Sequence, residues 1–287
     1  MIHKENFLII GGDNRQTFMA DYLEKSGYEI SVYGLADNNR TCCRNLCDAI
    51  ANNKNIVLPL PISKDGIYLT STVPIKETIN DIVSELSENH NVFGGMISST
   101  MESKLKRNNS RVFDYFKREE VTVMNAVPTV QGILKAIIDN VDYTINSSRC
   151  AVFGYGRIGS LTADILSSLG AETIVCARKY SDLAKADIKG IRSCLIKDFK
   201  DIAKEIDIII NTVPSVILNR DILSELRKDC LIIDVASAPY GTDFAVASEL
   251  GLNAMLCPSL PGKVAPRTAG EIIAKGILNI IREELYG

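Results

Sequence analysis

The chain has 287 residues, which suits one large domain or two domains of about 100 to 200 residues each, and we expect two. Its 46% hydrophobic and 23% charged residues are typical of a globular protein and exclude a disordered or fibrous one. A formal net charge of -3 supplies no cationic field for nucleic acid or for an anionic membrane.

No apolar run approaches the roughly 18 residues that span a bilayer, and the charged start of the chain does not resemble a signal peptide. Eight cysteines in a chain of this length are then expected to be reduced thiols rather than a disulfide framework. These features predict a soluble, cytoplasmic protein that binds neither nucleic acid nor a membrane.

Short runs rich in Ile and Val alternate with segments of helical period, which is the pattern of a parallel sheet with crossover helices. The sequence therefore predicts an α/β fold with two doubly wound, Rossmann-like domains and a cleft between them. In the first half, strands are expected at 7–10, 29–33, 55–58, 91–93 and 121–124, and helices at 17–25, 76–88 and 111–118. In the second half, strands are expected at 150–153, 173–177, 208–211, 231–235 and 253–256, and a helix at 160–169.

The domain boundary is expected in the segment 125–148, where Pro128 and Thr129 are suited to start a hinge helix. The last helix, 268–284, has apolar positions that need a partner surface, and we expect it to pack on the first domain. Residues 1–125 with 268–287 are thus predicted to form a substrate and catalytic domain. Residues 126–267 are predicted to form the cofactor domain, with the hinge helix at its start.

The strongest motif is a glycine-rich turn between an apolar run and an amphipathic helix. Its first glycine permits a tight turn, the second lets a pyrophosphate approach the backbone, and the third lets the helix pack closely on the strand. The free amides and positive dipole at the helix N-terminus would receive the pyrophosphate. The alternative is a glycine-rich turn with a purely structural role. The residues predicted to bind a dinucleotide are Gly154, Tyr155, Gly156, Arg157, Ile158 and Gly159.

About twenty residues further on, Arg178 and Lys179 stand where a carboxylate would bind the adenosine ribose of NAD. A carboxylate would repel a 2′-phosphate, whereas Arg178 can bind it with two hydrogen bonds and Lys179 adds a second positive charge. NADP is therefore the predicted cofactor. The alternative is that Arg178 stacks on the adenine and both cofactors bind.

Three further strand ends are expected at the carboxyl edge of the second sheet, where open α/β folds bind their ligands. Each apolar strand breaks into a loop of small residues and prolines, which suits a nicotinamide and its ribose lying over the backbone. Ordinary loop chemistry is the alternative for any one of these loops. The residues expected at the cofactor are Thr212, Val213, Pro214, Asp234, Ala236 and Pro258.

A second glycine turn, Gly11-Gly12, follows the first predicted strand, but it lacks the third glycine of a dinucleotide motif. Its amides and Arg15 are expected to receive a substrate carboxylate, and the Ser98 hydroxyl to donate a further hydrogen bond. Asp13 is a candidate proton acceptor at the same turn. Helix capping is an equal alternative for Asp13 and Ser98.

The chain contains two histidines, His3 and His90, and neither lies in a motif. This argues against a Ser-His-Asp hydrolase, and a histidine-ligated metal is not expected. Cys42, Cys43 and Cys47 cluster in the sequence, but their spacing is not a zinc pattern. No metal site is therefore predicted.

These motifs together resemble the family of the dipicolinate synthase A subunit over nearly the whole chain. The most specific are the Gly-Gly-Asp turn at 11–13 and the Leu-Pro-Gly-Lys-Val-Ala-Pro-Arg-Thr-Ala-Gly segment at 260–270. The likeness also includes the glycine fingerprint and the segments 125–132, 142–145, 177–178, 211–215 and 241–244.

The resemblance implies a sporulation oxidoreductase that uses NADP in the mother-cell cytoplasm. With a flavoprotein-like B subunit, such an enzyme makes dipicolinic acid from a dihydrodipicolinate-type intermediate. Forming an aromatic ring drives this oxidation, so the enzyme mainly has to hold the ring carbon against the nicotinamide. The substrate would then be a small dicarboxylate, with Arg15 at one carboxylate and Lys263 or Arg267 near the other.

Two other functions are compatible with the sequence. One is a dehydrogenase of the D-2-hydroxyacid or alanine type, although the hydroxyacid type looks to carry a catalytic histidine where residues 265–268 have none. The other is a non-catalytic NADP-binding protein that serves a flavoprotein. The oligomeric state is left open, with a homodimer as one outcome.

Overall fold

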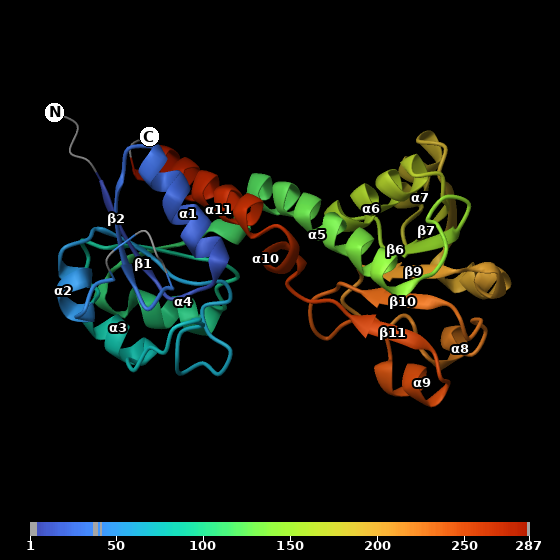
Figure 1. The fold of residues 1–287 in the computed structure, drawn as a ribbon, viewed down its shortest axis with the longest axis horizontal. Coiled ribbons are helices and arrows are strands. Elements are labelled where there is room, and N and C mark those ends of the chain that lie inside the picture. Colours follow the sequence, from blue (N-terminus) through green and yellow to red (C-terminus); the bar gives the residue numbers. More distant parts are fainter. Residues whose placement is uncertain (1–4, 37–39, 41, 286–287) are drawn as a thin grey trace. The chain divides into compact units, whose positions relative to one another are not determined.

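The computed structural model describes residues 5–36, 40 and 42–285. It divides into two compact units, Met1–Asn125 with Ala265–Gly287 and Ala126–Val264. Each unit is built on one parallel sheet whose strands alternate with helices, which confirms the predicted fold class (Figure 1). The predicted cleft between the domains stays a prediction.

The sheet of the first unit contains β1 (Asn6–Ile10), β2 (Glu29–Tyr33), β3 (Asn55–Val57), β4 (Asn91–Gly94) and β5 (Arg111–Asp114). The strands lie in the order β2-β1-β3-β4-β5, and all are parallel. From β1 the chain goes first to β2 on one side and then to β3 on the other. The topological switch point, where open α/β sheets bind ligands, therefore lies between the carboxyl ends of β1 and β3.

Both faces of this sheet are covered because successive strand residues point to opposite sides. Phe7 and Ile9 face a core that includes Met19 of α1 and Ile277 of α11. The alternate strand residues face a second core with α2, α3 and α4. The helices of the unit are α1 (Asn14–Lys25), α2 (Leu46–Ala51), α3 (Ile79–Glu85), α4 (Ser99–Leu105) and α11 (Pro266–Ile280), with shorter turns η1 (Lys106–Asn108), η2 (Tyr115–Lys117) and η4 (Ile281–Leu285).

Helix α11 packs directly on α1 within the first unit (Figure 1). Gly270 makes the approach close: a Cβ atom there would overlap the Arg15 carbonyl oxygen and lie 2.9 Å from the Met19 amide nitrogen. The two helix backbones are therefore in contact at this point. The N-terminal turn of α1 is held in place by the C-terminal part of the chain.

The sheet of the second unit contains β6 (Arg149–Phe153), β7 (Glu172–Ala177), β8 (Arg192–Leu195), β9 (Ile208–Asn211), β10 (Leu231–Asp234) and β11 (Asn253–Leu256). Their order is β11-β10-β9-β6-β7-β8, all parallel, which is the order of the Rossmann fold. The switch point of this sheet lies between β6 and β9.

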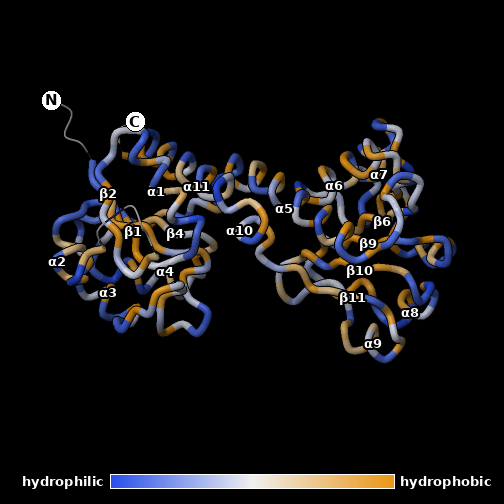
Figure 2. Tube along the Cα trace, in the orientation of Figure 1, coloured by the Kyte–Doolittle hydropathy of each residue, from blue (hydrophilic) through white to orange (hydrophobic). Residues whose placement is uncertain are grey.

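Hydrophobic residues of these strands fill one core on each face of the second sheet, and β6, β9 and β10 are among the hydrophobic stretches in Figure 2. On one face, Val152 and Ile210 pack with Ile137 of α5 and Leu166 of α6. On the other face, the alternate residues pack with Phe199 and neighbouring side chains. The covering elements are α5 (Glu119–Asn140) from Ala126 onward, α6 (Arg157–Ser168), α7 (Tyr180–Ile188), η3 (Ile196–Glu205), α8 (Arg220–Leu223), α9 (Phe244–Glu249) and α10 (Leu260–Val264). The residues of α5 before Ala126 belong to the first unit.

The structure corrects the sequence predictions near the unit boundary. Residues 121–124, predicted as a strand, belong to α5, and residues 111–118, predicted as a helix, form β5 and η2. Helix α5 also starts before Pro128, which lies inside it. Val121 is buried in helical geometry against Gly276 of α11, so tertiary packing overrides the strand propensity of the Val-Thr-Val run. Apart from 121–124, the predicted strands are confirmed, with ends that differ by one residue at most.

Among the helices that the structure describes, α5 alone is long and apolar enough to cross a membrane by length and composition. It meets these criteria because it is longer than the sequence suggested. Its residues Val130, Ile133 and Ile137 are fully buried in the protein, as they would be in the core helix of a soluble protein. The packing thus accounts for the buried part of its apolar surface, whereas Val123, Met124, Val127 and Ile138 are exposed.

The close contact at Gly270 generates a stability prediction. Gly270→Ala should lower the free energy of unfolding by about 1 to 3 kcal/mol, because the added methyl group must push α11 away from α1. Helix propensity alone would change stability in the opposite direction, since Ala is a better helix former than Gly. Thr268→Ala, at an exposed position of the same helix, is the control and should leave stability nearly unchanged. Urea unfolding of the two variants measures the difference, and equal stabilities would contradict the proposed contact.

Candidate functional site

The turn between β6 and α6 has the geometry that a dinucleotide needs. Gly154 has a φ of +93°, and a Cβ there would lie 2.5 Å from the Thr212 hydroxyl oxygen. A Cβ on Gly159 would overlap the Gly154 carbonyl oxygen, so α6 can approach the strand only with glycine at this position. A Cβ on Gly156 would meet nothing within 4 Å. The first and third glycines thus serve close packing, and the second borders open space where a pyrophosphate can approach the backbone.

The N-terminus of α6 is suited to an anion. Its N-cap is Gly156, and no side chain caps the helix. The first amides of a helix lack partners within the helix and carry its positive dipole end, so a phosphate can take the place of the missing cap. Tyr155 and Ile158 are half-buried against the second unit's core, while Arg157 is exposed.

The ends of β9, β10 and β11 lie in register, as the sequence predicted. Asn211 is opposite Asp234, which is opposite Leu256. Thr212 follows β9 and donates a hydrogen bond of 2.8 Å from its hydroxyl to the Phe153 carbonyl, which ties this loop to the end of β6. Of the other predicted cofactor residues, Val213 is half-buried, Pro214 and Pro258 are exposed, and Ala236 is nearly buried.

Asp234 is fully buried, and its carboxylate holds the loop after β10. Its two oxygens each accept a backbone hydrogen bond of 3.0 Å, one from Ala236 and one from Gly241. Both amides lie in the loop between β10 and α9. Asp234 therefore shapes this loop from inside and presents no exposed oxygen to a ligand.

A pocket of about 320 Å³ lies at the carboxyl ends of β7 and β8. It is lined by Arg178 and Tyr180 from the loop after β7, and by Leu195, Ile196 and Lys197 from the end of β8 and the start of η3. Sequence reasoning found Arg178 but missed Lys197, because β8 was not predicted. Lys179, the predicted second charge, is the exposed N-cap residue of α7 and does not line this pocket.

In the first unit, Asp13 caps α1 and binds Arg15. The carboxylate accepts a 3.0 Å hydrogen bond from the Arg15 amide and bonds of 2.9 and 2.8 Å from its guanidinium Nε and Nη2. Nη2 also donates to the Leu60 carbonyl at 2.6 Å, so Arg15 joins the loop after β1 to the loop after β3. Arg15 thus spans the switch point of the sheet, and its Nη1 donates to no residue among those described.

Burial acts to raise the pKa of the Asp13 carboxyl, but the hydrogen bonds and the charge of Arg15 outweigh it, so this pKa lies below its ordinary value. The carboxylate is therefore ionised throughout the neutral range. The Asp13 amide donates to the Gln16 side-chain oxygen at 2.9 Å, which completes a capping box at the start of α1. Helix capping is thus the role of Asp13 that the structure describes.

Tyr115 lies in the same region, and sequence reasoning missed it because its segment was predicted to be helical. Its side chain is fully buried, and its hydroxyl has no hydrogen-bond partner among the described residues. Burial raises the pKa of Tyr115, so the hydroxyl stays protonated and can donate. Gly95 gives the ring its space, since a Cβ there would lie 2.5 Å from the ring carbon Cε2.

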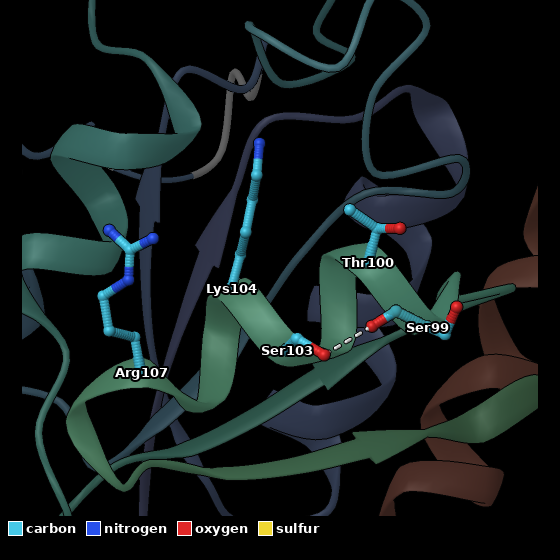
Figure 3. Close-up of a pocket in the computed structure, with 5 residues that line it drawn as sticks. All are labelled: Ser99, Thr100, Ser103, Lys104 and Arg107. Atoms are coloured by element: carbon cyan, nitrogen blue, oxygen red, sulfur yellow. Dashed lines mark hydrogen bonds between the residues drawn. The ribbon is translucent and has the colours of Figure 1, made fainter.

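Ser98 caps α4 by accepting a 3.2 Å hydrogen bond from the Met101 amide. The following helix carries a shallow pocket of about 430 Å³. Figure 3 shows the residues that line it, Ser99, Thr100, Ser103, Lys104 and Arg107, all on α4 or just after it. Ser103 donates its hydroxyl to the Ser99 carbonyl at 2.9 Å, so that group is satisfied within the helix.

The two other cationic candidates belong to different units. Lys263 is exposed on α10 in the second unit. Arg267 is exposed in the first turn of α11 in the first unit, where its guanidinium carbon lies 5.2 Å from the centre of the Phe18 ring. Their predicted role at the second carboxylate stays a prediction.

His90 is a structural residue: it is nearly buried just before β4, at the amino edge of the sheet. Its Nδ1 accepts from the Ser87 amide at 2.9 Å, and its Nε2 lies 3.2 Å from the Ile50 carbonyl oxygen. His3 lies outside the described residues. Within the described part of the chain, no three His, Cys, Asp or Glu side chains gather as a metal site would require.

Family models match both units. The model of the N-terminal domain of the dipicolinate synthase A subunit matches residues 6–116. The model of the NAD binding domain of D-isomer specific 2-hydroxyacid dehydrogenases matches residues 134–251. The chain is thus a dehydrogenase-type oxidoreductase with a domain for a nicotinamide cofactor.

Similar proteins point to one family. The A subunit of dipicolinate synthase from Bacillus subtilis (strain 168) is 34% identical over 282 residues, which cover 96% of this chain and 95% of that protein. The chain belongs to the family of the dipicolinate synthase A subunit. The crystal structure of the family member from Bacillus halodurans superposes with a TM-score of 0.89 at 29% identity, and covers 99% of both chains. A transhydrogenase from Sinorhizobium meliloti, 13% identical with a TM-score of 0.70 over 97% of this chain and 94% of its own, shares the fold alone.

The three glycines of the β6–α6 turn generate a prediction that separates folding from binding. Gly156→Ala should fold as the unmodified protein does and weaken nicotinamide-dinucleotide binding by about tenfold or more, because the methyl group occupies the space that the pyrophosphate must approach. Gly159→Ala should instead lower the free energy of unfolding by about 1 to 3 kcal/mol. Calorimetric titration and urea unfolding of both variants test this. Unchanged cofactor affinity in Gly156→Ala would contradict it.

Proposed function

We propose that this chain oxidises a dihydrodipicolinate-type intermediate to dipicolinic acid with NADP, as the A subunit of a dipicolinate synthase. The observation that carries the proposal is the 34% identity to a dipicolinate synthase A subunit along 96% of the chain. The N-terminal family model supports it further, because that model matches the unit proposed to bind substrate, whereas the 2-hydroxyacid dehydrogenase model matches the cofactor unit alone.

The cofactor's place in the proposal rests on the second unit. The open space at Gly156 and the uncapped N-terminus of α6 fit a pyrophosphate. Arg178 fits a 2′-phosphate, since it is exposed at the end of β7 and pairs with no carboxylate among the described residues. A nicotinamide dinucleotide held by these residues would supply a hydride acceptor for the substrate. The strand ends of the second sheet are proposed to lie along the nicotinamide half of the cofactor. Their residues are Thr212, Val213, Pro214 and Pro258.

The substrate's place rests on the carboxyl edge of the first sheet. The Nη1 of Arg15, which donates to no residue among those described, is proposed to hold one carboxylate of the dihydropyridine, with the Ser98 hydroxyl as a further donor. Lys263 or Arg267 is proposed for the second carboxylate. The Asp13 carboxylate is the proposed proton acceptor; its lowered pKa makes it a weak base, which suits a reaction that aromatisation drives.

The proposal also includes a cellular setting and a partner. A member of this family would act in the cytoplasm of the mother cell of a sporulating bacterium, beside a flavoprotein-like B subunit. We propose that this chain catalyses the oxidation itself. Its second unit has a turn suited to a dinucleotide, and the carboxyl edge of its first sheet has hydrogen-bond donors for a substrate. The B subunit is then a partner in assembly and not the oxidant.

The experiment that tests this function uses the purified chain without the B subunit. Freshly prepared dihydrodipicolinate and NADP should give reduced cofactor and dipicolinic acid in equal amounts, followed by absorbance and mass spectrometry. Gly156→Ala is the control that should fold but turn over slowly. A chain that binds NADP but forms no dipicolinic acid, either alone or with the B subunit, would contradict the proposal. Oxidation of D-2-hydroxy acids in place of this substrate would do so as well.

Asp13→Asn tests the proton acceptor. The amide preserves the shape of the side chain and much of its capping capacity, so the variant should fold and bind NADP normally but lose turnover by about a hundredfold or more. Because the hydrogen bonds and charge of Arg15 hold the Asp13 pKa below its ordinary value, the base stays ionised at neutral and mildly acidic pH, and unmodified turnover should not decline from this group in that range. Turnover within a few-fold of normal in Asp13→Asn would leave Asp13 with its capping role only.

A further inference from the structure

The pocket at the ends of β7 and β8 joins two cations from neighbouring strands. Ala177, the last residue of β7, is opposite Leu195, the last residue of β8. Arg178 follows directly, and Lys197 comes two residues after Leu195. Parallel pairing therefore brings both side chains to the same edge of the sheet, and both line the same pocket.

No carboxylate compensates these two charges within the described part of the chain. Neither Arg178 nor Lys197 forms an ion pair there, and the other lining residues are Tyr180, Leu195 and Ile196, which carry no charge. Asp182 pairs with Lys185 instead. The pocket is thus a concave surface with two free positive charges.

Four other lysines on or next to the flanking elements differ in this respect, whereas Lys179, which also forms no ion pair within the described part of the chain, lies outside the pocket. On α7 and just after it, Lys185 and Lys189 pair with Asp182 and Asp164. On η3, Lys200 and Lys204 pair with Asp221 and Glu225. A pair of uncompensated cations in a pocket is expected where an anionic ligand supplies the opposite charge.

The position and lining of the pocket identify the part of a dinucleotide that fits. β7 and β8 lie on the side of β6 away from β9, so the pocket is one strand removed from the phosphate-binding turn. Leu195 and Ile196 offer apolar surface, and Tyr180 is 73% exposed. An adenosine can rest on such surfaces while a phosphate on its ribose binds the two cations.

We infer that Lys197, together with Arg178, binds the 2′-phosphate of the adenosine ribose and determines the preference for NADP over NAD. The inference rests on the proposed function, since it assigns the residues that select its cofactor. It also separates the roles of two lysines, since the sequence alone does not show which of them binds the phosphate. Lys197 lines the pocket, whereas Lys179, adjacent to Arg178, does not.

The test compares Lys197→Ala with Lys179→Ala. Each variant removes one positive charge from an exposed position, so neither should disturb folding, and circular dichroism checks this. Calorimetry at fixed ionic strength measures the affinities for NADP, for NAD and for the fragment adenosine 2′,5′-bisphosphate. Arg178→Ala is the positive control, because Arg178 lines the pocket beside Lys197.

Lys197→Ala should weaken binding of NADP and of the bisphosphate by about tenfold or more, as expected for loss of a charge-assisted hydrogen bond, and leave NAD binding unchanged. Lys179→Ala should change all three affinities by less than about threefold. Unchanged NADP affinity in Lys197→Ala, or equal losses in the two lysine variants, would overturn the inference while the proposed function stands. An unmodified protein that binds no NADP would overturn both.

Discussion

In both sheets every strand points the same way, so the loops that follow the strands all leave from one edge, and this direction decides where ligands can bind. In the second unit it places the loop after β9 against the turn after β6, where Thr212 bonds to Phe153. The close approach of Gly159 to the Gly154 carbonyl then sets the start of α6 above the same edge. The proposed cofactor residues come from separate strands and meet only because those strands are parallel.

In the first unit a single side chain, that of Arg15, connects the loop after β1 to the loop after β3. Arg15 is nearly buried, and its guanidinium binds both the cap of α1 and the loop after β3, so it closes the switch point of the sheet. Removing it would leave the Leu60 carbonyl and the Asp13 carboxylate without their shared donor. The hydroxyl of Tyr115, also buried and without a partner among the described residues, adds an unsatisfied donor to this unit. The Asp13 carboxylate and the Arg15 guanidinium thus take part in helix capping, in the connection between the two loops and in the proposed substrate binding.

The sequence predicted well what short-range spacing determines. The glycine roles at 154, 156 and 159 follow from local sterics, and the apolar runs of the buried strands were recognisable by themselves. It failed where packing decides: Val121, the first residue of a Val-Thr-Val run, is helical and packs against Gly276 of α11, a long-range contact that no local pattern predicts. Lys197 was missed because β8, a half-exposed edge strand of sequence Arg-Ser-Cys-Leu, has little apolar signal. Asp13 could not be assigned in advance, since capping and proton transfer require the same carboxylate at the same turn.

The first unit is made of two segments that are far apart in the sequence, and this affects how the protein can assemble during synthesis. Its core includes Ile273, Ile277 and Ile281 from the last part of the chain, and α1 has its backbone contact with Gly270 there. Residues 126–264 of the second unit leave the ribosome earlier and form one uninterrupted segment. Domains usually fold as units and in order from the N-terminus. Here the later unit can complete its core first, while the first unit has α1 but not yet α11 on one face of its sheet until the end of the chain is released.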